Sequence, residues 1–152
     1  IKDLNMKITI KTGNIFDSSC HALVNPVNCV GVMGAGLAKQ FKTKFPNNFN
    51  KYLRQCWDKT LIIGVCFTTT EANKRIVNFP TKFHWKNGSQ YDYIQAGLNA
   101  LVRHIKHYKI TSIAIPALGC GLGGLEFSKI KIMIEETLSV LDDEIYVELY
   151  SI

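Results

Sequence analysis

Two glycine-rich segments each connect an apolar, strand-like run to a segment with helical periodicity. The first, NCVGVMGAGLA (28–38), follows the apolar run HALVNPV (21–27). The second, ALGCGLGGLEF (117–127), begins at the end of the apolar run TSIAIPAL (111–118). A chain that alternates strands and helices in this way builds a largely parallel sheet with helices on both faces. The two loops would then meet at the carboxyl ends of the strands, which is the usual ligand-binding edge of an open α/β sheet.

The remaining periodicity continues the same pattern. Period-two and apolar runs predict further strands at 7–13, 64–70, 75–81 and 144–152. Four-residue apolar spacing predicts helices that begin near Gly36, Tyr91 and Ser128, with Ser128 as an N-cap, and Pro46 either ends the first helix or begins another. No linker or internal repeat divides the chain. We therefore expect one domain over 1–152, in which 1–5 are a short extension or a cloning remnant.

The composition excludes several classes of protein. Five cysteines without a CxxC pair argue against a disulfide framework and a structural zinc site, and favour reduced thiols in the cytoplasm. No apolar run approaches the roughly 18 residues that a membrane span needs, and the N-terminal segment lacks the apolar core of a signal peptide. The net charge of +6 favours anionic partners. A solvated helical face would explain equally well the cluster of Lys39, Lys42, Lys44, Lys51 and Arg54.

The two glycine-rich loops suit a phosphate-bearing ligand. Glycine lacks the Cβ that would keep a phosphate away from the backbone, and a helix N-terminus supplies free N–H groups and the positive end of a dipole. GCGLGG matches the dinucleotide pattern GxGxxG, but too little chain follows it for a Rossmann half, and Asp142 and Asp143 precede a strand instead of ending one. One such loop is more often a simple turn, whereas two loops, each between a strand and a helix, favour the interpretation that the loops bind a phosphate.

Polar side chains near the loops are candidates for chemistry. Asn25 and Asn28 lie where a strand ends, and their amides could bind ribose hydroxyls or only cap the loop. Lys82 and His84 alternate with aromatic residues in FPTKFHWK. A lysine in such surroundings is either a partly desolvated nucleophile, able to attack an anomeric carbon, or a solvated side chain that passes along the rings. His84 could transfer a proton, orient the lysine or be purely structural.

Three motifs in this order resemble the macrodomain family. They are ALVNPVNCVGVMGAGLAKQF (22–41), FPTKFHW (79–85) and IPALGCGLGGLEF (115–127). The resemblance covers nearly the whole chain and is strongest to the DarG-type antitoxin macrodomains, which remove ADP-ribose from DNA. The human terminal ADP-ribose protein glycohydrolase is a more distant relative. The resemblance implies a three-layer α/β/α sandwich with a central six-stranded mixed sheet, and an ADP-ribose cleft over the two glycine-rich loops.

By position, the resemblance implies roles for individual residues. Lys82 takes the place of the catalytic lysine of the DarG-type group, and Asn28 that of the asparagine near the distal ribose. His84 has a less defined place in the lysine motif, and Asn14 stands where most macrodomains carry an aspartate that reads adenine. Gly123 stands where the human relative carries a catalytic aspartate, so a mechanism that needs this acid is not expected. The expected catalytic residues are Lys82, Asn28 and His84, and the expected ADP-ribose-binding residues are Asn14, Ile15, Asn25, Asn28, Gly34, Ala35, Gly36, Leu37, Gly119, Cys120, Gly121, Leu122 and Gly123.

The function implied is an ADP-ribosyl glycohydrolase that removes ADP-ribose from thymidine in single-stranded DNA and opposes a DNA-ADP-ribosylating toxin. Three alternatives stay open: hydrolysis of ADP-ribose from protein carboxylates, a reader that binds ADP-ribose without turnover, and an ADP-ribose 1″-phosphate phosphatase. A catalytic Lys82 separates the two glycohydrolases from the other two classes, which have no use for it. We expect a cytoplasmic monomer that needs no cofactor and no metal, and no membrane partner.

Overall fold

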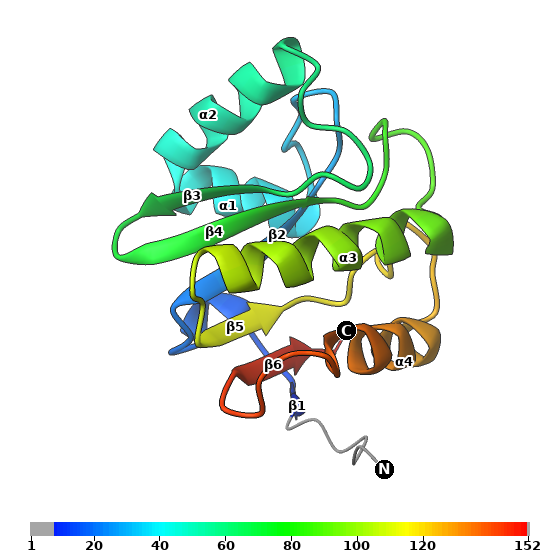
Figure 1. Cartoon of the computed structure of the whole chain (residues 1–152). Coiled ribbons are helices and arrows are strands. Elements are labelled where there is room, and N and C mark those ends of the chain that lie inside the picture. Colours follow the sequence, from blue (N-terminus) through cyan, green and yellow to red (C-terminus); the bar gives the residue numbers. More distant parts are fainter. Residues whose placement is uncertain (1–7, 152) are drawn as a thin grey trace.

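The computed structural model describes residues 8–151, and the prediction for residues 1–5 lies outside this range. Figure 1 shows α3 and α4 on one side of the sheet and α1 on the other. In chain order the elements are β1 (Ile8–Lys11), the 3-10 turn η1 (Ile15–Asp17), β2 (Ala22–Val27), α1 (Gly36–Lys44), α2 (Pro46–Trp57), β3 (Phe67–Glu71), β4 (Lys74–Pro80), α3 (Tyr91–His107), β5 (Ser112–Ile115), α4 (Phe127–Leu138) and β6 (Tyr146–Tyr150).

The six strands form one mixed sheet in the order β1-β6-β5-β2-β4-β3. Neighbouring strands are parallel except at the edge, where β3 runs antiparallel to β4. The β3–β4 connection turns through Ala72 and Asn73, whose φ values of 50° and 60° suit a two-residue hairpin. The predicted six-stranded mixed sheet is confirmed.

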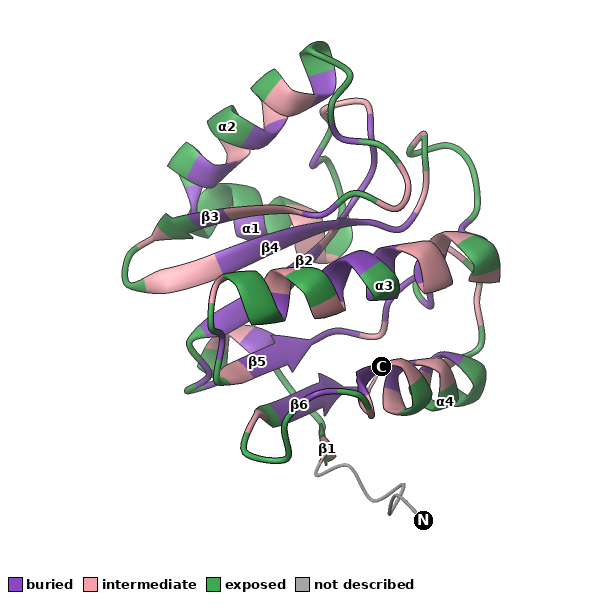
Figure 2. Ribbon diagram, in the orientation of Figure 1, coloured by how far each residue is buried: buried purple, intermediate pink, exposed green. Residues whose placement is uncertain are grey.

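Alternation along the central strands separates two cores. In β2, Ala22 and Val24 pack toward α3 and α4, whereas Leu23 packs toward α1. β4 repeats this pattern with Val77 on the first face and Ile76 on the second. Figure 2 accordingly shows most of β2, β4 and β5 as buried, which is typical of strands covered on both faces. The predicted three-layer α/β/α sandwich is confirmed.

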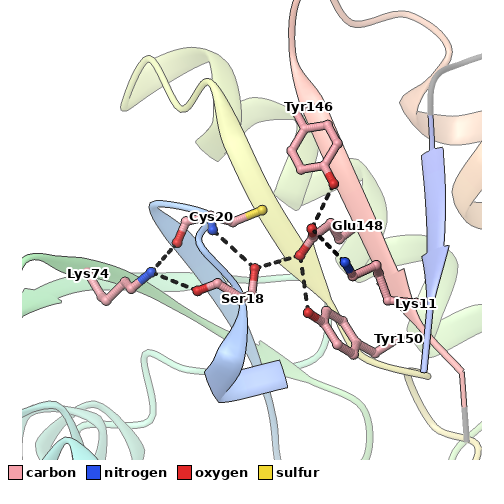
Figure 3. A network of polar contacts seen from close by, with 7 residues as sticks. All are labelled: Lys11, Ser18, Cys20, Lys74, Tyr146, Glu148 and Tyr150. Carbon is pink, nitrogen blue, oxygen red and sulfur yellow. Dashed lines mark hydrogen bonds and ion pairs between the residues drawn. The ribbon is translucent and has the colours of Figure 1, made fainter. Parts of the chain in front are cut away.

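A buried carboxylate connects the last strand to the segment before β2 (Figure 3). Glu148 of β6 accepts hydrogen bonds from the hydroxyls of Ser18 at 2.6 Å, Tyr146 at 2.7 Å and Tyr150 at 3.2 Å. The ammonium group of Lys11 on β1 lies 3.9 Å away. Burial alone would raise the pKa of Glu148, but the hydrogen bonds to its charged form outweigh burial and leave the pKa below its usual value. The cluster fixes Tyr150 at the carboxyl edge of the sheet.

The helix starts follow the predicted spacing with one exception. α1 begins at Gly36, and Pro46 begins α2, which decides between the two roles left open for this proline. The prediction of Ser128 as an N-cap is wrong, because α4 already begins at Phe127 and Glu126 occupies the N-cap position without a capping side-chain bond. Within residues 8–151, no helix is both long and apolar enough to cross a membrane.

Candidate active site

A cleft of about 890 Å³ opens at the carboxyl edge of the sheet. All five parallel strands contribute residues to it. The stretches that end or follow β1, β2, β4, β5 and β6 are 13–15, 26–28, 81–82, 116–117 and 150–151. The two glycine-rich loops and the first turn of α1 complete the lining. The loops therefore meet at one edge of the sheet, as the sequence predicted.

Among the described residues 8–151, none that lines this cleft carries a carboxylate. Lys82 is the only charged side chain in this described part of the lining. The two long stretches that carry the glycine-rich loops, 18–57 and 93–125, contain no aspartate or glutamate at all. The described lining residues thus offer no carboxylate as a general acid or base, and their charge favours an anionic ligand.

The first glycine-rich loop brings the N-terminus of α1 to the cleft. Gly34, Ala35, Gly36 and Leu37 all line it. Ala35 is the N-cap of α1 and makes no side-chain capping bond, so the first-turn N–H groups stay available to an anion. Gly36 has a left-handed φ of +57°, and a Cβ built there would meet no atom within 4 Å. The backbone at this point is therefore open to a ligand.

Asn28 supports the first loop from below. Its Oδ1 accepts hydrogen bonds from Tyr52 Oη at 2.8 Å, Val30 N at 3.1 Å and Val32 N at 3.3 Å. Its Nδ2 donates to Val32 O at 2.7 Å. An amide nitrogen carries two hydrogens, so one N–H of this cleft-lining side chain remains for a ligand.

The second glycine-rich loop is closed by its own backbone. Gly124 N donates to Gly121 O at 3.2 Å, and Leu125 N donates to Gly119 O at 2.9 Å. A Cβ on Gly123 would lie 2.4 Å from the carbonyl oxygen of Gly119, so a larger residue requires the backbone to shift. An aspartate at this position does not fit the observed loop. The residues of this loop that line the cleft are Gly119, Gly121, Leu122 and Gly123.

Ser89, which the sequence analysis did not select, braces this second loop. Its backbone N–H donates to Gly123 O at 3.0 Å, and its Oγ would lie 2.4 Å from a Cβ on Gly123. Ser89 lines the cleft, and its buried Oγ has no hydrogen-bond partner among the described residues. The side chain occupies the space in which an acidic residue at position 123 would have to sit.

Two backbone bonds place Lys82 in the cleft. Thr81 N donates to Val27 O at 2.9 Å, and Cys29 N donates to Phe83 O at 2.8 Å. These bonds extend the pairing of β2 with β4 beyond both strands. They hold the half-buried Lys82 beside the end of β2, where its side chain lines the cleft.

Three predicted site residues do not line the cleft. Strand alternation turns Asn25 into the layer beneath α2, where it is fully buried and its Nδ2 donates to Asn78 Oδ1 at 3.1 Å. His84 Nδ1 accepts a hydrogen bond from Lys86 N at 3.1 Å and thereby closes a turn. Cys120 is buried, and burial raises the pKa of its thiol to about 11, which leaves no reactive thiolate near neutral pH.

Asn14 and Ile15 line the cleft beside the end of β1. Asn14 Oδ1 accepts a hydrogen bond from Phe16 N at 2.9 Å and so caps η1. Further lining residues went unpredicted because nothing in their own residue types suggests a ligand. For Tyr150 and Ser151, at the end of β6, a signal lay in the position, since residues at the end of a parallel strand reach the same edge as the loops. The unpredicted lining residues include Gln40, Trp85, Ser89, Tyr150 and Ser151.

Comparison with known proteins identifies the family. The Macro domain family matches residues 24–133, and the chain belongs to this family. A Thermus aquaticus protein named DNA ADP-ribosyl glycohydrolase is 42% identical over 134 residues, which cover 86% of this chain and 37% of that protein. The chain spans about two fifths of the length of the curated bacterial relatives that it matches.

Solved structures agree with the family assignment. The macrodomain of Mycobacterium tuberculosis DarG matches with a TM-score of 0.92 and 38% identity, over 95% of this chain and 97% of that one. Thermosipho africanus DarTG, solved in complex with ADP-ribose, matches with a TM-score of 0.85 and 35% identity, over 97% of this chain and 42% of that one. The human ADP-ribose glycohydrolase OARD1 is 26% identical across 93% of this chain and 90% of that protein. The predicted resemblance, strong to DarG macrodomains and weaker to the human protein, is confirmed.

Proposed function

We propose that this domain is an ADP-ribosyl glycohydrolase that removes ADP-ribose from thymidine in single-stranded DNA. The observation that carries the proposal is Lys82, which is the only charged side chain that residues 8–151 contribute to the cleft at the N-terminus of α1. The cleft offers anion-binding amides and one amine nucleophile in the same space. The names of the bacterial relatives, and the ADP-ribose bound to one of them, support the same assignment.

The proposed ligand spans the cleft from β1 to Lys82. The adenine lies near Asn14 and Ile15, beside the end of β1. The diphosphate lies between the uncapped first turn of α1 and the second glycine-rich loop, where backbone N–H groups neutralise its charge. The remaining N–H of Asn28 donates to a hydroxyl of the distal ribose, and Lys82 faces its anomeric carbon.

In the proposed reaction the Lys82 amine attacks this anomeric carbon. A bond forms between Nζ and the carbon, and the bond from the carbon to the thymine base breaks. The base, still part of the DNA, leaves with the bonding electron pair and takes up the proton that the amine loses. The ribose ring of the lysine adduct then opens to an imine, and water hydrolyses this imine, which releases ADP-ribose and restores the amine. The buried thiols are not alternative nucleophiles, because burial raises the pKa of Cys29 to about 12 and that of Cys120 to about 11.

Substitution of Lys82 tests the proposal. Lys82→Ala is expected to lose at least about a thousandfold in release of ADP-ribose from single-stranded DNA modified on thymidine, while calorimetry shows ADP-ribose binding within about threefold of the unchanged protein. Borohydride added during turnover should reduce the lysine imine of the unchanged protein to a stable amine, heavier than the protein by ADP-ribose less one oxygen atom, and should trap nothing in the variant.

Lys39→Ala is the matched control, because Lys39 is an exposed lysine next to the cleft that does not line it. Full activity of the control with loss in Lys82→Ala supports the mechanism. Binding without cleavage in all three proteins would make the domain a reader. Cleavage of ADP-ribosylated peptide carboxylates, with none of DNA, would move the proposal to the protein-directed class, and release of phosphate from ADP-ribose 1″-phosphate alone would move it to the phosphatases.

The proposed partner, besides the substrate, is a toxin that ADP-ribosylates DNA. The Thermosipho relative supports this, because its name describes a fusion of a DNA ADP-ribosyl transferase with a DNA ADP-ribosyl glycohydrolase. We also propose that the domain acts in the cytoplasm as a monomer without metal or cofactor. Light scattering after gel filtration measures the mass in solution, and activity after dialysis against EDTA measures any need for metal.

A further inference from the structure

Large apolar side chains stand exposed around the mouth of the cleft. Trp85 and Leu122 line the cleft and are 49% and 79% exposed. Phe83, one residue beyond Lys82, is 54% exposed, and Val32 of the first loop is 39% exposed and also lines the cleft. We call these four residues the apolar rim. Folding normally removes large apolar side chains from water, so several of them exposed beside a ligand cleft indicate a surface that binds a partner.

The aromatic part of the rim is held in a defined place. The carbonyl oxygen of Phe83 accepts a hydrogen bond from Cys29 N at 2.8 Å, which ties this segment to the first loop. The turn that follows is closed by Asn87 N, which donates to His84 O at 3.0 Å, and by the bond from the Lys86 backbone to His84 Nδ1. His84 thus positions its neighbours and does not itself enter the cleft lining.

The charge beside these rings is positive. Lys86 Nζ lies 5.2 Å from the centre of the Trp85 ring, a cation–π arrangement. The segment 72–91 contains no aspartate or glutamate, and neither does 18–57, which carries the facing loop. An acidic protein surface would gain only from the lysine, and an apolar surface only from the rings. A polyanion with exposed planar bases gains from both parts.

We propose that Phe83, Trp85 and Lys86 form a docking surface for single-stranded DNA, on which nucleotides flanking the modified base stack while Lys86 contacts a backbone phosphate. This inference rests on the proposed function, because the modified base must leave from the carbon that faces Lys82. The flanking nucleotides therefore pass within a few residues of this surface. Stacking needs unpaired bases, so the surface favours a single strand over a duplex and tolerates any sequence.

The test compares two substrates of the same enzyme. One is a short single-stranded oligonucleotide with one ADP-ribosylated thymidine, and the other is the ADP-ribosylated thymidine nucleoside alone. Phe83→Ala and Trp85→Ala should each lower the ratio of kcat/KM for the oligonucleotide to that for the nucleoside by about tenfold. Lys86→Ala should reduce the slope of log binding constant against log salt concentration for the oligonucleotide by about 0.7.

Trp57→Ala is the matched control, since Trp57 is 69% exposed at the end of α2 and does not line the cleft. Its ratio of kcat/KM for the oligonucleotide to that for the nucleoside should stay unchanged. The melting temperature of every variant should stay close to that of the unchanged protein. Equal ratios in all variants and the control would overturn the docking surface while leaving the glycohydrolase intact. An equal loss with ADP-ribosylated peptides would also overturn it. Failure of the unchanged protein on both the oligonucleotide and the nucleoside would instead refute the proposed function.

Discussion

The two glycine-rich loops have similar compositions but are held in different ways. The first is supported from below by one side chain, Asn28, and ends in the uncapped N-terminus of α1. The second is closed by bonds within its own backbone, and α4 begins only at Phe127, outside the cleft lining. Glycine content alone therefore does not distinguish these two kinds of loop. One presents open backbone N–H groups on a helix, and the other is a rigid wall whose shape depends on the absence of Cβ atoms.

Removing the side chain beneath the first loop is the strongest test of this difference between the loops. Asn28→Ala is expected to lower the free energy of unfolding by about 3 kcal/mol. The backbone N–H groups of Val30 and Val32 lose their acceptor, and the buried Tyr52 hydroxyl loses one of its two acceptor oxygens. Urea denaturation measures the loss. Tyr52→Phe, the control, removes only the hydroxyl and should cost about 1 kcal/mol. Equal losses in the two variants would show that Asn28 is not the main support.

The second loop should resist loss of a single side chain but not the addition of a methyl group. Gly123→Ala is expected to cost about 2 kcal/mol and at least about tenfold in ADP-ribose affinity, because its Cβ would lie 2.4 Å from Gly119 O. Gly121→Ala meets no atom within 4 Å and should cost under about 0.5 kcal/mol. Calorimetric titration and urea denaturation compare the pair. A similar effect at both glycines would refute the rigid-wall description.

The thiols near the two loops, Cys29 and Cys120, should be equally unreactive, so the smallest difference between the loops is expected here. Burial raises the pKa of Cys29 to about 12 and that of Cys120 to about 11. Because each thiol has a higher pKa in the folded protein than the ordinary value of 9.0, its contribution to the free energy of unfolding is fully present below pH 9.0. This contribution is lost as the pH rises through 11 for Cys120 and 12 for Cys29. Iodoacetamide at pH 8 should therefore leave both thiols unlabelled in the folded protein and label them in urea, as mass spectrometry would show. Rapid labelling of the folded protein would contradict this.

Periodicity predicted the architecture because each strand and helix carries its own apolar pattern. The alternating runs located all six strands, and the glycine-rich loops located the cleft. Contacts between distant segments were not predictable in this way. Asn25 and Asn28 look alike in the sequence, and only the direction of β2 separates the buried amide from the lining one. Ser89 drew no attention, because its importance depends on the packing of Gly123. Ser128 has the residue type of a cap, yet the helix starts one residue earlier.

The pairing of β1 with β6 has a consequence for how the chain is made. The register sets Ile8 opposite Val147, so β1, which is made before the other five strands of this sheet, can pair only after β6 has left the ribosome. Until then one edge of β5 lacks its neighbouring strand, and the Ser18 hydroxyl lacks its acceptor Glu148, which lies 130 positions later. Contacts of such sequence separation form late and slowly. A nascent chain that stalls before Tyr146 would leave this edge of the sheet open to other strands, so synthesis of β6 is the step that protects the domain from aggregation through this edge.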